Sequence, residues 1–454
     1  MSEIEVAIIA TGLALGLVLV GELIARNTPL LRRVAMPGAV LGGCVGLLLG
    51  PQVTGWISQQ DLGGLVYEQL ADFPSIFING VFACLLLGKR IQGVSSLWRR
   101  ARAPIVMGHV YAWGQYVVGI GAYLLVLAPL FDVDHLAAAT IAIGFQGGHG
   151  TSAGLTESFV NLGFPEGKTI AFAVATFGIV AGAIGGPVLA AALKKRHRTN
   201  EDSVPLPESQ TTEESKDEQK SFGSVTGELS LHLALVAVIT ALGWGLLKGV
   251  ESIERAVRGG LSDGGSTFTA YIPLFSVVLL AGMAVQIVMQ SMGWDRFFRR
   301  SQFNSIAAFS LDMVILGALA TLSLATVGDY LGVISVLCAA GLAWNLLVFF
   351  LLGPRVYPKP WHAYGLGDLG GGTATTASGL LLVRIADPDQ RTGALRAYSE
   401  KQPLYEPLMG GGLVTASALP ALASMGPLAC FAITAVVLAF WLALAIRLAS
   451  QAEQ

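Results

Sequence analysis

Two glycine-rich stretches interrupt long apolar sequence and decide how this chain folds. The first is Gln146-Gly147-Gly148-His149-Gly150-Thr151-Ser152, and the second is Gly365-Leu366-Gly367-Asp368-Leu369-Gly370-Gly371-Gly372-Thr373-Ala374-Thr375-Thr376. In hydrocarbon an unpaired backbone N–H or C=O is costly, so irregular backbone survives only where protein or a water-filled cavity surrounds it. Each break therefore predicts a position that is enclosed by protein or lined by water.

The composition predicts an all-α polytopic membrane protein. Apolar residues make up 53% of the 454 residues, charged residues only 13%, and the mean hydropathy is +0.64. Soluble domains carry about 25% charged residues, so lipid is the natural surrounding for this surface. The net charge of −2 gives no indication of nucleic-acid binding. The expected apolar spans are 6–24, 34–50, 73–88, 104–130, 168–193, 226–247, 268–291, 304–326, 331–353, 404–424 and 427–447.

Basic residues in short loops mark the cytoplasmic side of a membrane protein. In the first half, basic loops follow the first and third spans, whereas 51–72 and 131–135 contain no Lys or Arg. This alternation places the N-terminus outside, provided that segment 136–165 crosses the membrane zero or two times. Two crossings need about 40 residues, and this segment is shorter. We therefore predict a re-entrant hairpin that enters from outside.

The second half repeats the arrangement with the opposite orientation. Basic residues mark its inner loops, and the second break, within 362–385, enters and leaves from inside because a basic loop follows it. The basic residues that follow it are Arg384, Arg391, Arg396 and Lys401. The loop 248–266 should lie outside although it contains Lys248, Arg255 and Arg258, and we interpret it as an interfacial amphipathic helix.

The expected domains follow from this topology. Two inverted-topology repeats of five spans, 1–193 and 225–424, each contain a re-entrant hairpin, at 136–165 and 362–385. A cytoplasmic acidic linker, 194–224, joins them and has too few apolar groups to fold alone. Residues 425–454 are expected to form an additional C-terminal helix, and the side of the C-terminus stays open.

The breaks offer groups that bind ions. Helix N-termini favour anions, and carbonyls freed at a break can coordinate sodium. One tip from each side, meeting near the midplane, is the plan of inverted-repeat transporters. The alternative is that the glycines serve only in packing, as we expect for Gly42, Gly43, Gly46, Gly182, Gly185 and Gly186. The candidate substrate-binding residues are Gly147, Gly148, His149, Gly150, Thr151, Ser152, Gly371, Gly372, Thr373, Ala374, Thr375 and Thr376.

A few other polar residues lie within the spans. Gln115 and Asn345 each sit on the span before a hairpin, which suggests that they face one cavity. Asp312 is a carboxyl group well inside a late span, where an unpaired charge is expensive; it is a cation ligand, a proton carrier or part of a structural pair. Glu22 and Asp368 lie nearer the interface. The candidate ion-binding residues are Gln115, Asp312, Asn345 and Thr373, with sodium as the expected ion and no other cofactor.

At these residues the chain resembles the sodium/glutamate symporter family. The resemblance is carried by Gly147-Gly148-His149-Gly150-Thr151 and by Ala175-Thr176-Phe177-Gly178 through Gly185-Gly186-Pro187. It implies sodium-coupled uptake of an acidic amino acid, L-glutamate, across a bacterial inner membrane. It also implies a homodimer in which the hairpin-bearing core moves against a fixed scaffold, like an elevator.

The second half departs from the family pattern. Gly371-Gly372-Thr373-Ala374-Thr375-Thr376 stands where the family has a Gly-Ala-Thr-Pro-type tip, Thr415 replaces an Asp, and Pro37-Gly38-Ala39 replaces a Pro-Glu-Pro type sequence. Other hypotheses therefore remain: a transporter of another carboxylate, such as a hydroxy di- or tricarboxylate, or a channel whose re-entrant loops form a filter. An enzyme is not expected, because the six histidines form no HExxH motif and no acid pair is present.

Overall fold

The computed structural model describes residues 2–28, 37–54, 62–89, 94–197, 225–258, 272–374 and 376–452. Every regular element in these ranges is a helix. Within them, eight helices are long and apolar enough to cross a membrane. This confirms the prediction of an all-α polytopic membrane protein.

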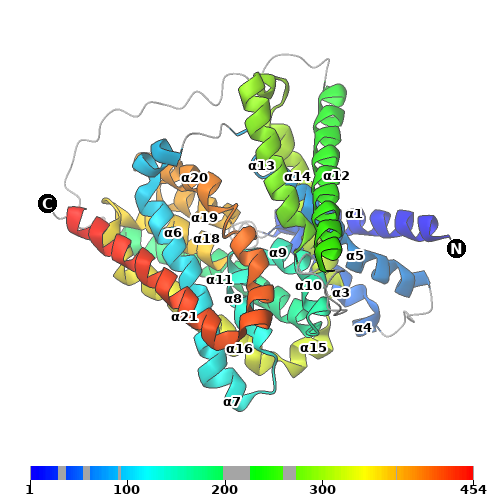
Figure 1. Cartoon of the computed structure of the whole chain (residues 1–454), viewed down its shortest axis with the longest axis horizontal. Coiled ribbons are helices and arrows are strands. Elements are labelled where there is room, and N and C mark those ends of the chain that lie inside the picture. Colours follow the sequence, from blue (N-terminus) through cyan, green and yellow to red (C-terminus); the bar gives the residue numbers. More distant parts are fainter. Residues whose placement is uncertain are drawn as a thin grey trace.

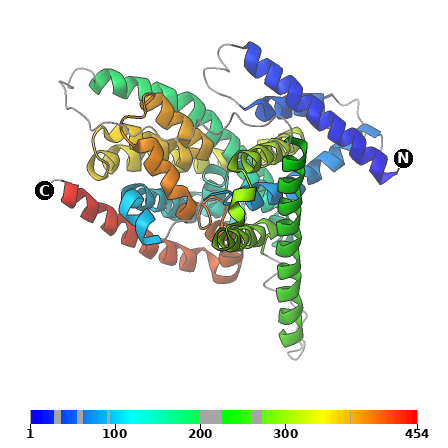
Figure 2. The ribbon, with the colours of Figure 1, turned by 90° about the horizontal axis from the view of Figure 1, so that it is seen from above.

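One group of helices, which we call the frame, lies on one side of the molecule (Figures 1 and 2). Its helices are α1 (Glu3–Asn27), α3 (Gly38–Leu49), α5 (Leu62–Cys84), α12 (Val225–Arg258), α13 (Leu274–Met292) and α14 (Arg300–Ala320). Helices α1 and α3 cross closely, because a methyl group at Gly42 would lie 2.3 Å from the carbonyl oxygen of Leu17. Gly43 and Gly46 in turn pack against Leu319 and Ala320 of α14. These three glycines are packing residues, as predicted.

The second group, which we call the core, lies beside the frame. Its longer helices are α6 (Val94–Ala122), α11 (Glu166–His197), α16 (Leu331–Leu351), α18 (Trp361–Thr373), α19 (Thr376–Ala386), α20 (Ala394–Tyr405) and α21 (Leu413–Ala452). Its short helices are α8 (Thr140–Phe145), α9 (Gly148–Gly154) and α10 (Thr156–Asn161). The remaining short turns are α4 (Pro51–Thr54), η1 (Tyr123–Leu127), α7 (Ala128–Leu130), η2 (His135–Ala139), η4 (Trp294–Phe297), α15 (Leu324–Asp329) and α17 (Gly353–Val356).

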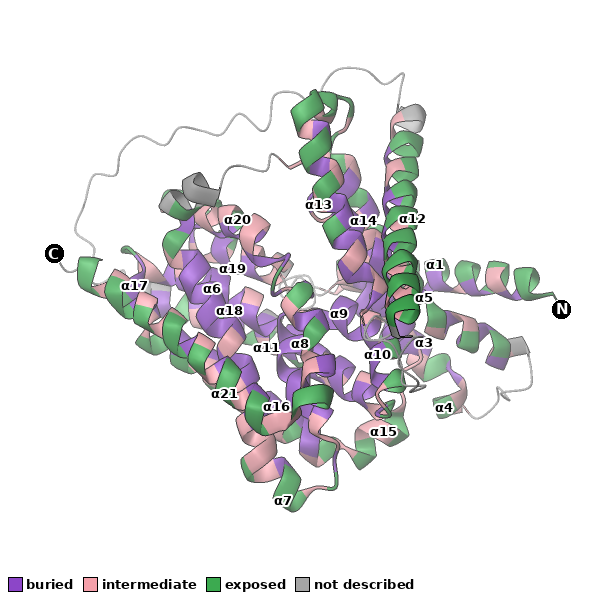
Figure 3. Cartoon of the chain, in the orientation of Figure 1, coloured by how far each residue is buried: buried purple, intermediate pink, exposed green. Residues whose placement is uncertain are grey.

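Both groups draw on both halves of the chain. In the first half, the helices before α6 belong to the frame, and α6 with the helices after it belongs to the core. In the second half, α16 marks the same division. Helix α9 contacts α5 and α14 and so joins the core to the frame. Figure 3 shows α8, α9 and α18 largely buried, whereas α12 exposes much of its length.

Several predicted boundaries are wrong. Helix α12 continues to Arg258, so residues 248–258 are part of a long helix and not of a loop. Side-chain pairs within the helix support this extension, since Lys248 lies 2.8 Å from Glu251 and Arg255 also binds Glu251. Residues 259–266 of that loop lie outside the described residues, as do residues 198–224 of the predicted linker.

Two other spans differ in length from the prediction. Helix α5 starts at Leu62 and ends at Cys84, where the chain turns through Gly88 with a φ of +69°. The guanidinium of Arg300 donates to the carbonyl oxygens of Cys84 and Leu87, so it caps the end of α5. Helix α21 runs from Leu413 to Ala452 and bends at Gly426, which has a φ of +77°.

Candidate functional site

Both glycine breaks are shorter than the sequence suggested. The first is confined to Gln146 and Gly147, because α9 is already helical from Gly148. Gly148 has a φ of +65°, a conformation that favours glycine. Residues 365–373 belong to α18, so the second break falls at Ala374, just before α19 begins at Thr376.

Helical backbone satisfies its own hydrogen bonds, which explains why so little of either motif is irregular. The glycines in α18 instead allow close contacts, since a methyl group at Gly370 would lie 2.9 Å from the Cα of Gly379 on α19. Thr375 lies outside the described residues. We call residues 146–152 the first tip and residues 371–374 with Thr376 the second tip.

The second tip is held by two amide side chains from different halves of the chain. The Nε2 of Gln115 on α6 lies 2.6 Å from the carbonyl oxygen of Gly372, and the Nδ2 of Asn345 on α16 lies 2.8 Å from it. Gln115 also donates to the Oδ1 of Asn345 over 3.0 Å, and both residues are fully buried. The structure therefore brings Gln115 and Asn345 together at one carbonyl group, and their role as ion ligands stays a prediction.

The first tip is held by fewer hydrogen bonds. The Nε2 of His149 lies 2.9 Å from the Oγ1 of Thr176 on α11, and the hydroxyl of Tyr405 donates to the Oε1 of Gln146. Ser152 donates to the carbonyl oxygen of Gly148 within its own helix. The Oγ1 of Thr151 is buried without a hydrogen-bond partner among the described residues.

Helix α11 passes both tips. Thr176 binds the first tip, and a methyl group at Gly178 would lie 2.0 Å from the carbonyl oxygen of Thr373 in the second. Gly182 also faces the second tip, since a methyl group there would lie 3.6 Å from the Cβ of Ala374. Gly185 has open space around it and Gly186 packs on Leu382. The conformation of the second tip thus depends on the absence of a side chain at Gly178.

A third break, absent from the sequence prediction, connects the two tips. Residues 406–412 separate α20 from α21 within what was expected to be the span 404–424. The Oγ1 of Thr376 in the second tip donates to the Oε1 of Glu406 over 2.8 Å. A methyl group at Gly411 would lie 2.3 Å from the Oγ1 of Thr151 in the first tip. The run Gly410-Gly411-Gly412 after Pro407 was the signal that could have revealed this break.

A buried ion pair between α18 and α20 lies beside the second tip. The Nζ of Lys401 on α20 lies 2.6 Å from the Oδ1 of Asp368 on α18, with side chains 3% and 2% exposed. Tyr357 donates to the other carboxylate oxygen, and Lys401 lies over the rings of Tyr398 and Tyr405 at 4.6 and 4.7 Å from their centroids. Lys401 is therefore a buried residue of a helix, so the prediction from the basic residues that it lies in a loop is wrong, whereas the position of Asp368 near the membrane interface stays a prediction.

Asp312 lies in the frame, on α14. Its charge interacts with that of Glu22 on α1. Among the described residues it forms no hydrogen bond or ion pair with either tip. The structure gives no support for a shared site between Asp312 and the tips, and its role in ion binding stays a prediction.

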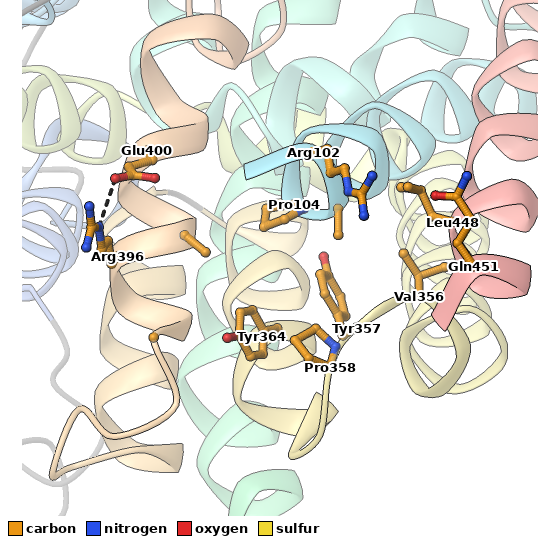
Figure 4. Close-up of a pocket in the computed structure, with 13 residues that line it drawn as sticks. Arg102, Pro104, Val356, Tyr357, Pro358, Tyr364, Arg396, Glu400, Leu448 and Gln451 are labelled. Carbon is orange, nitrogen blue, oxygen red and sulfur yellow. Dashed lines mark hydrogen bonds and ion pairs between the residues drawn. The ribbon is translucent and has the colours of Figure 1, made fainter. Parts of the chain in front are cut away.

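A cavity of about 690 Å³ opens at the end of the core where α6 begins and α21 ends. Figure 4 shows Arg102, Tyr357 and Tyr364 lining it, together with the Arg396–Glu400 pair, whose Nε and Oε1 lie 2.9 Å apart. Its size falls in the range of small-molecule sites. Because Tyr357 also binds Asp368, this residue separates the cavity from the buried ion pair.

Comparison with known proteins identifies the family of this chain. A family model described as "Sodium/glutamate symporter" matches residues 4–363. The "Sodium/glutamate symporter" of Escherichia coli (strain K12) is 29% identical over 315 residues, which cover 67% of this chain and 70% of that protein. The protein of the same name from Haemophilus influenzae is 30% identical over 176 residues, 37% of this chain and 40% of that protein. The chain belongs to the sodium/glutamate symporter family, and it is accordingly a membrane transporter and not an enzyme.

Proposed function

We propose that this protein is a secondary active transporter that couples the uptake of L-glutamate, or a similar acidic amino acid, to sodium. Its relatives are named sodium/glutamate symporters. We further propose that it lies in a bacterial inner membrane with its N-terminus outside. The basic loops of the first half support this orientation.

The observation that carries the proposal is the meeting of Gln115 and Asn345 at the Gly372 carbonyl. Each amide comes from the helix that precedes a hairpin in its own half of the chain. Inverted repeats place such corresponding groups on either side of one central site. This supports 1–193 and 225–424 as inverted repeats, with 136–165 and 362–385 as re-entrant hairpins and 194–224 as the linker.

The division into frame and core supports an elevator mechanism. The core contains both tips, and it meets the frame through α9, where a methyl group at Gly154 would lie 2.4 Å from the ring of Phe275. Glycine at such a boundary leaves a smooth surface for one body to move along the other. The frame exposes apolar side chains on α1 and α12, among them Leu19 and Trp244, which suit lipid or the second copy of a homodimer.

Within this proposal the two tips hold the substrate, as the candidate residues at both breaks suggest, and sodium binds beside them. The N-terminus of α19, which starts at Thr376, carries the positive end of the helix dipole and would favour a substrate carboxylate. Thr373 donates to the carbonyl oxygen of Leu369 over 2.7 Å, so its hydroxyl oxygen keeps lone pairs for a cation.

A transporter of another carboxylate, such as a hydroxy di- or tricarboxylate, is the second candidate. The family match ends at residue 363, the third residue of α18, so the second tip lies beyond it. The coupling mechanism does not depend on which of the two substrates is carried.

Uptake of radiolabelled glutamate by proteoliposomes tests the proposal. An inward sodium gradient should drive saturable accumulation, and replacing sodium by choline or collapsing the gradient with an ionophore should abolish it. Uptake of a hydroxydicarboxylate without glutamate accumulation would establish the second candidate instead. Flux that rises linearly with concentration and ignores sodium would identify a channel.

Two variants test the tips within the same assay. Gly148→Ala places a side chain at a φ of +65°, and Thr373→Val removes the hydroxyl beside the second break. Both should lose coupled uptake while the protein still folds. Gly185→Ala, which meets open space on α11, is the matched control and should transport normally.

A further inference from the structure

Glu406 occupies the junction between the two tips. It caps the C-terminal end of α20 and is only 6% exposed. Its Oε1 accepts the 2.8 Å hydrogen bond from Thr376, the first residue of α19. This carboxyl group is thus fixed to the second tip through one of its two oxygens.

The second oxygen of this carboxyl group is unused. The Oε2 of Glu406 is buried and has no hydrogen-bond partner among the described residues. When a buried acceptor atom has no hydrogen-bond partner, the cost in free energy is larger if the atom belongs to a charged group than if it belongs to a neutral group. Thr151 in the first tip presents a second buried oxygen without a partner, and it lies against Gly411 of the same third break. One unsatisfied oxygen acceptor therefore belongs to the 406–412 segment itself, and a second one approaches this segment from the first tip.

Two cations that face Glu406 belong to the frame, and the guanidinium of Arg300 is held there by carbonyl oxygens. Lys89 and Arg300 interact electrostatically with Glu406. Arg300 donates to the carbonyl oxygens of Cys84 and Leu87 over 2.7 and 2.6 Å, and Gln286 accepts from the backbone N–H of Gly88 and donates to the carbonyl of Lys89. These contacts anchor the 84–89 turn, and neither cation donates a hydrogen bond to Oε2.

Lys401, which precedes Glu406 on α20, is also committed to another partner. Lys401 lies on the helix that ends beside Glu406, and its ammonium group forms the 2.6 Å pair with Asp368. Glu406 therefore faces the junction with a free oxygen and without a dedicated counter-ion from the core.

We propose that Glu406 binds a small cation at the junction of the two tips, through its Oε2. This inference rests on the proposed function and names a residue that binds one of the transported cations. The hydroxyl oxygens of Thr376 and Thr151 would complete an oxygen-rich environment that suits a hard cation. The cation is either the coupling sodium ion or the ammonium group of an amino-acid substrate, since an ammonium group offers three N–H donors to the same oxygens.

If the cation is the ammonium group of the substrate, Glu406 has a role in substrate specificity. Glutamate and glutarate carry the same two carboxylates, but only glutamate carries an ammonium group. A carboxyl group that pairs with that ammonium would favour amino acids over plain dicarboxylates, because a site built for a hydrogen-bonding group rejects analogues that lack it.

Glu406→Gln is the test variant, because the amide retains an acceptor for Thr376 and removes the charge. The matched control is Asp389→Asn, an exposed carboxyl group in the turn before α20. Binding of ²²Na⁺ to the purified protein is measured without substrate, and glutamate uptake is measured in proteoliposomes against unlabelled glutarate. Thermal unfolding verifies that both variants are folded, and Thr376→Val is a second variant should Glu406→Gln fail to fold.

If sodium is the ligand, Glu406→Gln should weaken ²²Na⁺ binding by about tenfold or more, which corresponds to about 1.4 kcal/mol. If the ammonium group is the ligand, sodium binding should stay unchanged and the preference for glutamate over glutarate should be lost. Unchanged sodium affinity together with unchanged preference would overturn the inference. A parent protein that binds sodium but does not take up glutamate would instead contradict the proposed substrate and leave the sodium comparison decisive for Glu406.

Discussion

The two tips resemble each other in sequence, yet the structure holds them in different ways. The first tip rests against the frame, where a methyl group at Gly150 would lie 2.9 Å from the Cδ1 of Ile78. Within the part of the chain that the structure describes, only His149 and Gln146 bind it to the core by side-chain hydrogen bonds to other helices. The second tip lies within the core, where Gln115 and Asn345 share its Gly372 carbonyl.

We infer from this difference that the two tips have separate tasks in the proposed transport cycle. A contact made of glycine and apolar side chains has no directional bonds to break, so the first tip suits a surface along which core and frame move. Hydrogen bonds and a buried ion pair fix geometry, so the second tip suits the positioning of ligands. The predictions below test this distinction.

The largest effect is expected at the ion pair beside the second tip. Lys401→Met leaves the Asp368 carboxylate buried without its cation, which costs about 3–5 kcal/mol. Thermal unfolding in detergent should shift strongly downward and uptake should be lost. The double variant with Asp368→Leu should recover much of the stability, because no unpaired charge remains.

An exposed pair on the same helix provides the control. Arg396 pairs with Glu400 while 71% exposed, so Arg396→Ala should change stability by less than about 1 kcal/mol. If Lys401→Met and Arg396→Ala lowered the unfolding temperature equally, the pair of Lys401 with Asp368 would not stabilise the second tip as a desolvated ion pair.

The second largest effect on stability and uptake is expected where α11 contacts the second tip. Gly178→Ala places a methyl group 2.0 Å from the Thr373 carbonyl oxygen, which forces the backbone apart and costs about 1–3 kcal/mol. Uptake should fall sharply, whereas Gly185→Ala on the same helix should leave it unchanged. Normal sodium-driven uptake by Gly178→Ala would mean that α11 and the second tip need not touch during transport.

Loss of one amide at the Gly372 carbonyl should have a smaller effect. Gln115→Leu and Asn345→Leu each remove one donor while the other stays, so each should cost about 1–2 kcal/mol. The double variant strands the buried carbonyl and should cost more than the sum of the singles. Double-mutant analysis of thermal unfolding measures this coupling, and strict additivity would argue against a shared acceptor.

The smallest effect is expected at the first tip. His149→Ala removes the 2.9 Å hydrogen bond to Thr176, which is worth about 1 kcal/mol. Thermal unfolding should change only modestly, and Thr176→Val should reproduce the change. A loss as large as that of Lys401→Met would reverse the distinction between the tips.

Parts of this arrangement follow from sequence. Long apolar runs identified the membrane helices, and the positions of Gln115 and Asn345 before each break led to the expectation that they face one cavity. Positive-inside reasoning could not identify Lys401 as buried, because a lysine that pairs with a carboxylate from a distant helix has the same sequence pattern as one in a loop. Asp368 and Lys401 are 33 residues apart, and only folding reveals that they meet.

The third break was missed for a related reason. Residues 406–412 lie inside a run apolar enough to be interpreted as one span, although Glu406 and three glycines occur in it. Helix propensity could not fix the extent of the first two breaks either, because glycines in α18 stay helical where neighbouring helices approach closely.

The hydrogen bond between Gln115 and Gly372 spans 257 residues of chain, and this separation has a consequence for biosynthesis. Helix α6 is synthesised and inserted long before Gly372. The side-chain amide of Gln115 therefore lacks its hydrogen bond to the Gly372 carbonyl until the second half of the chain follows. The frame likewise needs α14 from the second half to cover α3 and α5. The frame cannot close before α14 is inserted, and the core cannot close before α18 to α21 follow, so the first half must wait as an incompletely packed intermediate.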